Sequence, residues 1–271
     1  MDALTALRLQ IEWGANEALE AEPVDRLRPP SVRAPSVAPA STAGSAIMPQ
    51  AAASRVAGRE GPARREAPAE RAARVAAAAT TLDELRAAIA GFDGTTLRDT
   101  ATNMLFLEGD PVCGLLFVGE APNADADRSG SFFSGTVGSY LERMLHSIGL
   151  DRGTICLVPL IPWRPPGDRP PSQVEIATCL PFLHRAIVLV APRRIVALGP
   201  LPVRALLGAT PMRRRASPIW QNATIPGGMA QIPALAMPSP AILLRVPTHR
   251  RSAWADLRGL RHTLDIDLTQ K

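Results

Sequence analysis

One short loop contains polar residues whose types and spacing are suited to catalysis. Residues 118–141 read V-G-E-A-P-N-A-D-A-D-R-S-G-S-F-F-S-G-T-V-G-S-Y-L. Glu120 is the only carboxylate among its immediate small neighbours, and burial would raise its pKa, so it could orient a water molecule or bond the amides of its own loop. Asn123 could hold a water molecule or a carbonyl group. Alternatively it occupies a turn position with a left-handed backbone, which glycine usually fills and asparagine tolerates.

The elements on either side of this loop explain why it could form a site. The apolar run Leu115–Val118 predicts a buried strand, and the amphipathic pattern over residues 137–148 predicts a helix. The loop therefore connects a strand to a helix. In an open α/β sheet, ligands bind at such connections.

Further apolar runs alternate with helical patterns along the chain. Strands are predicted over residues 155–160, 194–199 and 233–237, and helices over 172–190, 202–207 and 249–264, with another helix opened by the capping-box spacing of Thr81 and Glu84. Pro181 predicts a kink in the helix over 172–190. Strands that alternate with helices indicate a parallel sheet covered on both faces. The expected fold is α/β, a three-layer α/β/α sandwich around a central, mostly parallel four-stranded sheet.

Composition divides the chain into three parts. Residues 22–76 are dominated by Ala, Pro, Ser, Arg and Glu, which predicts a disordered linker because such a segment buries too little apolar surface to offset its ordering entropy. Ahead of it, Leu4, Leu7 and Ile11 recur near helical spacing, so residues 1–21 are expected to form an amphipathic helix that docks on the main domain or binds a partner. The main domain is expected over residues 77–271.

Charge and the absence of targeting signals limit the partners. The formal net charge is +5, and Lys271 is the only lysine, so arginines supply nearly all of the basic groups. Such a surface suits a phosphate backbone, although a genome rich in G and C would produce the same arginine bias.

No signal peptide is evident and the longest apolar run is too short to span a bilayer, so we expect a soluble cytoplasmic protein with no membrane partner. Cys113 and Cys156 are expected to be small buried hydrophobes in a reducing compartment.

The loop resembles the first motif of the uracil-DNA glycosylase superfamily, most closely that of its iron-sulfur branch, family four, which reads roughly G-E-A-P-G-x-x-E-D-x-x-G-x-P-F-x-G. The residues in register are Gly119, Glu120, Ala121, Pro122, Asp127, Gly130, Phe133 and Gly135. Asn123, Ala126 and Phe132 depart from it. Companion motifs follow in the family's order at residues 162–169, 175–183 and 239–245. The resemblance covers about residues 80–265.

This resemblance implies hydrolysis of the N-glycosidic bond of uracil, or of a related damaged base, in DNA after the nucleotide has been flipped out of the helix. Phe133 stands where the family places the ring that stacks on uracil. Glu120 or Asn123 would place the water, and Ser239 stands where the family has a histidine donor to the base. Gly119, Ala121, Pro122 and Asp127 complete the expected base pocket.

The resemblance also implies a DNA-binding surface. The expected phosphate contacts are Arg164, Arg169, Arg245, Arg250 and Arg251. Leu243 or Leu244 is expected to be the wedge that fills the space of the flipped base, with helix-core packing as the alternative. The expected partners are DNA, with the protein a monomer associated with the nucleoid, and repair proteins recruited through the N-terminal helix.

Several departures from the family pattern affect the expected activity. Pro159 replaces an asparagine that reads uracil, and Ser239 replaces the histidine. Only Cys179 coincides with one of the four cysteines that hold the family's 4Fe–4S cluster, and Phe92, Thr95 and Trp163 stand at the other positions. We therefore expect no metal or iron–sulfur cofactor. Two hypotheses remain: a diverged, cluster-free glycosylase, which the retained loop favours, or a catalytically degenerate DNA-binding or repair-assembly module with the same fold.

Overall fold

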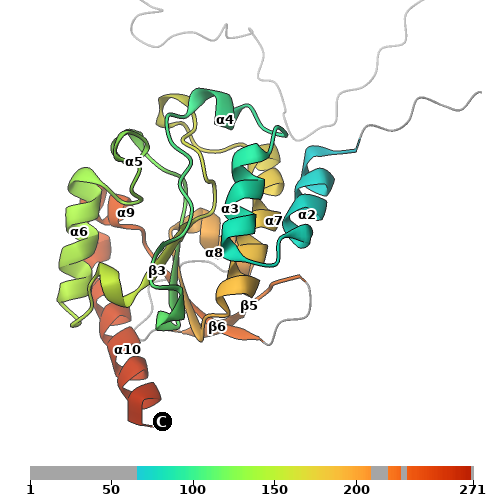
Figure 1. Cartoon of the computed structure of the whole chain (residues 1–271). Helices are drawn as coiled ribbons and strands as arrows, with labels where there is room; N and C mark the ends of the chain where they lie inside the picture. The colour runs from blue at the N-terminus through green and yellow to red at the C-terminus, as the bar shows by residue number, and fades with distance from the viewer. Residues whose placement is uncertain (1–65, 209–218, 227–230, 270–271) are drawn as a thin grey trace, which may run out of the picture. The chain divides into compact units, whose positions relative to one another are not determined.

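The computed structural model describes residues 66–208, 219–226 and 231–269 (Figure 1). The predicted N-terminal helix and most of the predicted linker lie outside these residues. The predicted end of the linker is wrong, because helix α2 (Pro68–Ala78) occupies its last residues and buries Ala72 and Ala76 completely or nearly so. Alanine has the highest helix propensity and lets neighbouring helices approach closely. The domain therefore begins before α2 rather than at residue 77.

The sheet has six strands rather than the four predicted. They are β1 (Glu108–Gly109), β2 (Leu115–Gly119), β3 (Cys156–Pro159), β4 (Arg194–Leu198), β5 (Trp220–Ala223) and β6 (Ile232–Met237), in the order β1-β3-β2-β4-β6-β5. The four predicted strands form the parallel centre, and the additional strands β1 and β5 pair antiparallel at the two edges. Both edge strands escaped the sequence analysis because β1 is only two residues long and β5, W-Q-N-A, is largely polar.

Helices connect the strands and open the domain. After α2 come α3 (Leu82–Gly91), α4 (Leu97–Thr100), α5 (Ala124–Ser129), α6 (Gly135–His146), α7 (Gln173–Val190), α8 (Pro200–Leu207), α9 (Pro240–Arg245) and α10 (Arg250–Thr269). The predicted capping box opens α3, where the backbone N–H of Glu84 donates to Thr81 Oγ1 (3.1 Å) and that of Thr81 to the Glu84 carboxylate (3.3 Å). Helix α7 is 18 residues long and is not interrupted at Pro181.

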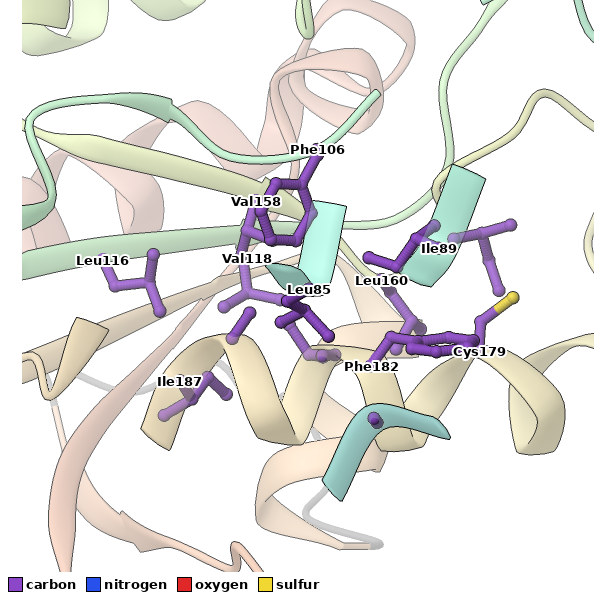
Figure 2. Close-up of a cluster of buried hydrophobic side chains, with 14 of the residues drawn as sticks. Leu85, Ile89, Phe106, Leu116, Val118, Val158, Leu160, Cys179, Phe182 and Ile187 are labelled. Carbon is purple, nitrogen blue, oxygen red and sulfur yellow. The ribbon is translucent and has the colours of Figure 1, made fainter. Parts of the chain in front are cut away.

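Helices cover both faces of the sheet, as predicted: α2, α3 and α7 lie on one face, and α6, α9 and α10 on the other (Figure 1). The side chains of β2 alternate accordingly. Leu116 and Val118 belong to the core on the α7 side, whereas Leu115 and Phe117 belong to the core on the α6 side. Figure 2 shows the first of these cores, in which Phe182 of α7 packs close to side chains of the sheet. The molecule is thus a three-layer α/β/α sandwich.

Helix α7 is long and apolar enough, by length and composition alone, to cross a membrane, with a mean hydropathy of 1.4. Its inward side chains are nevertheless part of the core just described. Cys179, Phe182 and Ile187 are almost fully buried there. Its apolar character is therefore explained by packing within the domain.

The carboxyl ends of the parallel strands bring together residues that are distant in sequence. Gly119 at the end of β2 pairs with Pro159 of β3, and Leu198 of β4 pairs with Met237 of β6. Glu120 follows β2 directly, and Ser239 follows the end of β6 after one residue. The loops after β2 and β6 consequently meet at one edge of the sheet.

Candidate active site

A cavity of about 70 Å³ lies at this edge of the sheet. Its walls come from the loop after β2, from α6 and from the start of α9. The lining residues are Glu120, Ala121, Asn123, Ala126, Phe132, Phe133, Val137, Ser239 and Ala241. The structure thus brings together Glu120, Ala121, Asn123, Phe133 and Ser239 from the predicted site. The remaining predicted base-pocket residues lie outside the cavity wall.

Glu120 is anchored across the sheet rather than to its own loop. Its Oε1 accepts a hydrogen bond from the backbone N–H of Leu201 (3.3 Å), in the first turn of α8, where the helix dipole favours negative charge. Within the described part of the chain no other donor reaches its carboxylate. Burial raises its pKa, and the Leu201 N–H and the charge of Arg245 oppose that shift. Gly199 makes room for the group, because a Cβ there would lie 2.8 Å from Glu120 Cδ.

Asn123 begins helix α5. Its backbone is extended (φ −95°), so it does not replace a glycine in a left-handed turn, and that alternative is excluded. Its Oδ1 accepts a hydrogen bond from the backbone N–H of Ala126 (2.9 Å). Such N-caps satisfy helix donors that otherwise lack a partner. The side-chain carbonyl is therefore already used, and the amide nitrogen is the group left for a ligand.

Ser239 plays the same capping role for α9 from the opposite wall. Its side chain is buried and its Oγ accepts a hydrogen bond from the backbone N–H of Ile242 (3.3 Å). A hydroxyl can accept and donate at once. Ser239 can therefore cap the helix and still donate its hydrogen into the cavity.

Phe133 forms a wall of the cavity together with Phe132. The two ring centroids lie 4.2 Å apart, and Phe133 is only 8% exposed, so its ring is packed into the core and also lines the cavity. Gly119 lies directly beneath, and a Cβ at that position would come within 2.8 Å of the Phe133 ring. Phe133 has a left-handed backbone (φ 55°), which is costly for a bulky residue and persists only where the surroundings enforce it.

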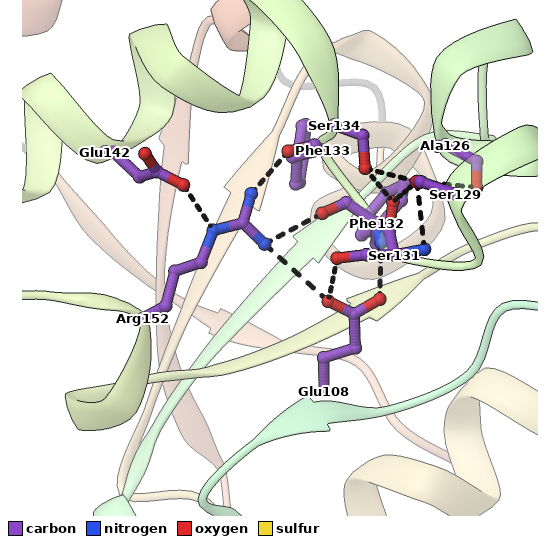
Figure 3. Close-up of polar contacts among 9 residues, drawn as sticks. All are labelled: Glu108, Ala126, Ser129, Ser131, Phe132, Phe133, Ser134, Glu142 and Arg152. Carbon is purple, nitrogen blue, oxygen red and sulfur yellow. Dashed lines mark hydrogen bonds and ion pairs between the residues drawn. The ribbon is translucent and has the colours of Figure 1, made fainter.

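Arg152 and Glu108 hold this strained segment in place (Figure 3). The Arg152 guanidinium donates to the backbone carbonyl of Phe132 (3.0 Å) and to that of Phe133, and its Nε lies 3.0 Å from Glu142. Glu108 accepts from the backbone N–H of Phe132 and from Ser131 Oγ (3.0 Å). We call Arg152 and Glu108 the clamp. Sequence analysis missed the clamp because neither residue belongs to a motif and both are about 20 residues or more from Phe132.

Asp127, Gly119 and Pro122 have structural positions beside the cavity. Asp127 is buried and its Oδ1 accepts from the backbone N–H groups of Thr102 (2.8 Å) and Asn103 (2.9 Å), which fastens α5 to the segment after α4. Pro122 is buried in the same loop. These residues shape the loop and do not face the cavity.

The predicted DNA contacts divide into two groups. Arg164 pairs with Asp168 (2.7 Å), and Arg169 forms a forked pair with Glu175 (2.6 Å), lowering the pKa of that carboxyl to about 2. The second group consists of Arg245, Arg250 and Arg251, which are exposed and form no ion pair within the described residues.

Of the two interpretations of Leu243, the structure supports helix-core packing rather than the wedge, because the side chain is only 1% exposed and packs in the core on the α6 side. Its position on the inner face of the short helix α9 explains the burial. Val246, the residue directly after α9, has an apolar side chain that is 39% exposed. A wedge at this place would therefore come from Val246.

The residues at the family's cluster positions do not fit an iron–sulfur cluster. Phe92, Trp163 and Cys179 all belong to the buried core on the α7 side, where the Phe92 and Phe182 rings meet edge to face at 5.1 Å. Burial raises the pKa of the Cys179 thiol to about 12, which opposes formation of the thiolate that binds metal. No group of three or more His, Cys, Asp or Glu that could hold a metal occurs among the described residues. The predicted burial of Cys156 is confirmed, whereas Cys113 is only half-buried.

Comparison with known proteins covers the site and most of the domain. The family model described as the uracil DNA glycosylase superfamily matches residues 106–258. A Type-4 uracil-DNA glycosylase of Pyrobaculum aerophilum is 33% identical over 180 residues, which are 65% of this chain and 91% of that protein. Proteins of the same name from Sulfurisphaera tokodaii and Archaeoglobus fulgidus are 34% and 35% identical over 44% of this chain, and the matches cover 54% and 60% of them.

Proposed function

Since the chain belongs to the uracil-DNA glycosylase superfamily and is most similar to its family four branch, we propose that it removes uracil from DNA by hydrolysing the N-glycosidic bond of a flipped nucleotide. The observation that carries this proposal is the cavity at the ends of β2 and β6. It combines an aromatic wall with a half-buried carboxylate and two polar side chains from opposite sides. Base flipping needs such a pocket, because the base must be stacked and its edge hydrogen-bonded.

Glu120 places the water in this proposal. Its Oε1 is held by α8, so the carboxylate is oriented before substrate arrives, and its Oε2 remains to accept a hydrogen from water. Burial raises the pKa of the group, which makes its ionised form a stronger base than an exposed glutamate. The water so oriented attacks the sugar carbon as the base departs.

Ser239 and Asn123 supply the hydrogen bonds to the base. The Ser239 hydroxyl donates to the departing uracil anion, and the Asn123 amide nitrogen donates from the opposite wall. Loss of one transition-state donor typically costs about a hundred- to a thousand-fold in rate. Pro159, at the end of β3, offers no donor at all. We therefore propose a slow enzyme rather than an inactive one.

DNA is held by the exposed arginines that have no carboxylate partner. Arg245 is the last residue of α9, and Arg250 and Arg251 begin α10, whereas Ser239 and Ala241 at the start of α9 line the cavity. Arg164 and Arg169 contribute less, because each must first leave an ion pair. In this proposal Val246 fills the space vacated by the flipped nucleotide. The protein acts in the cytoplasm, as a monomer and without an iron–sulfur cluster.

One observation favours a second candidate, a DNA-binding module without catalysis. Asn123 Oδ1 and Ser239 Oγ both cap helices, so two of the polar groups at the cavity already have structural uses. Such a protein would keep the arginine surface and lose base excision. The two candidates differ in a single property, the release of the base.

A comparison of two glutamine variants tests the proposal. Glu120→Gln keeps the size of the side chain and removes its basicity, whereas Glu142→Gln changes an exposed carboxylate away from the cavity. With uracil-containing oligonucleotides followed by alkali cleavage of abasic sites, Glu120→Gln is expected to lose about a hundred-fold or more in excision rate. Glu142→Gln is expected to keep the wild-type rate. Equal rates for wild type and Glu120→Gln would remove Glu120 from the mechanism.

A further inference from the structure

A second hollow lies between α6, α9 and α10, beside the candidate active site. Its volume is about 260 Å³, larger than that of the catalytic cavity. Its walls include Tyr140 and Arg143 from α6 and Arg250, Trp254 and Leu257 from α10. We call it the α6–α10 groove. Of its lining residues, only Arg250 already has a role in the proposed function.

The groove combines aromatic rings with arginines and has no acidic side chain in its lining. Trp254 is 44% exposed, which is unusual for so large an apolar side chain. The guanidinium groups of Arg143 and Arg250 lie 5.3 and 5.9 Å from the centre of the Tyr140 ring. Such a surface is complementary to a ligand that has both a flat ring and a negative charge.

The two arginines of the groove are available to an anion. Arg250 uses its Nε to donate to the carbonyl of Leu243 (3.0 Å), which orients the guanidinium and leaves its terminal nitrogens. Within the described part of the chain neither Arg143 nor Arg250 forms an ion pair with a carboxylate. Arg152, Arg164 and Arg169, by contrast, are all paired.

Helices α6 and α9 contribute residues to both the groove and the active-site cavity. Val137 of α6 lines the cavity, and Tyr140, one helical turn further on, lines the groove. Likewise Ala241 of α9 faces the cavity and Leu243 the groove.

We propose that the α6–α10 groove binds one unstacked nucleotide of the DNA strand whose neighbouring nucleotide enters the cavity. The base stacks on Trp254, and its phosphate contacts Arg143 and Arg250. The position of this nucleotide relative to the cavity rests on the proposed function, whereas its binding does not. The groove thereby favours single-stranded over duplex DNA, because only an unpaired strand offers a free base face.

Binding of uracil-free DNA tests the proposal independently of excision. The probes are a ten-nucleotide oligothymidylate and a duplex of the same length, with dissociation constants measured by fluorescence anisotropy over a range of salt concentrations. Trp254→Ala is expected to weaken single-strand binding about tenfold or more and to change duplex binding far less. Trp254→Phe is expected to retain most of the affinity. Val112→Ala, at another highly exposed apolar residue, is the matched control.

Arginine variants give a second readout that does not depend on the ring. Arg143→Gln is expected to lower the salt slope of single-strand binding by about one phosphate contact. Arg193→Gln, at the opposite end of the sheet where β4 begins, is expected to leave the slope unchanged. Wild-type single-strand affinity in Trp254→Ala, or an unchanged slope in Arg143→Gln, would overturn the proposal. If the wild-type protein shows this single-strand binding but excises no uracil, the proposed function is refuted and the groove proposal stands.

Discussion

The clamp on the Phe132–Phe133 segment makes a prediction that can be worked out from the structure. Arg152→Gln removes a charged donor from the carbonyls of both phenylalanines. Hydrogen bonds to charged groups contribute about 1.5–3 kcal/mol each, and the 28% exposure of the Arg152 side chain places this pair toward the low end. We expect a loss of about 2–3 kcal/mol in the free energy of unfolding. For a domain of this size that is a fall of about 5–10 °C in Tm.

Activity should fall by more than stability alone explains. The left-handed backbone of Phe133 stores about 1–3 kcal/mol, so loss of the clamp lets the segment relax and the ring leave the cavity wall. Because base–aromatic stacking contributes about 1–3 kcal/mol, excision under folding conditions should drop about ten- to a hundred-fold. Arg152→Lys keeps the charge but not the forked geometry, and should be intermediate.

Glu142→Gln is the matched control for this prediction. It removes a carboxylate that is 48% exposed and contacts Arg152, but leaves both carbonyl hydrogen bonds intact. Its effect on stability should be about 0–1 kcal/mol. Thermal unfolding and single-turnover excision are the assays. An Arg152→Gln protein with wild-type Tm and excision rate would refute the role given to the clamp.

Three further predictions follow from other parts of the structure. Deletion of residues 1–65 should leave a folded domain, whereas deletion of residues 1–78 should destabilise it strongly by removing Ala72 and Ala76, and thermal unfolding of the two truncated proteins decides this. The purified protein should contain no stoichiometric iron, which elemental analysis and visible absorbance measure, and a cluster spectrum would contradict it. Burial raises the pKa of Asp256 from 3.8 to about 6, because the charged carboxylate is less favourable in the folded protein than the neutral carboxyl group. The domain should therefore be most stable with respect to this group below about pH 4 and lose that stability as pH rises toward 6. Asp256→Asn should remove that loss, which pH-dependent thermal unfolding would detect as a flatter profile.

The central architecture was predictable because strong local signals carried it. The four parallel strands are short apolar runs, and Thr81 with Glu84 marks the start of α3. The site loop also stood out, because its residue order and its place after a buried strand both pointed to ligand binding. These features are encoded by neighbouring residues, so a single sequence is enough to find them.

What the sequence analysis missed depends on contacts between distant segments. Helix α2 contains no large apolar residue, and only its packing shows that alanines can serve as its buried face. The clamp joins the edge strand β1 to a turn before β3 and has no motif. The sequence left Leu243 either at the DNA or in the core, and only the direction of α9 shows that its side chain is buried. The ion pair of Arg169 with Glu175 depends on the loop before α7 and has no motif in the sequence.

The most direct test of the account is the release of free uracil by the wild-type protein. Purified protein is incubated in excess with single-stranded and duplex oligonucleotides that contain one uracil, and the liberated base and the abasic strand are quantified together. We expect slow, stoichiometric release of uracil, with an equal amount of abasic DNA. No release from either substrate, in a protein that still binds DNA with a steep dependence on salt, would contradict it and establish the binding module instead.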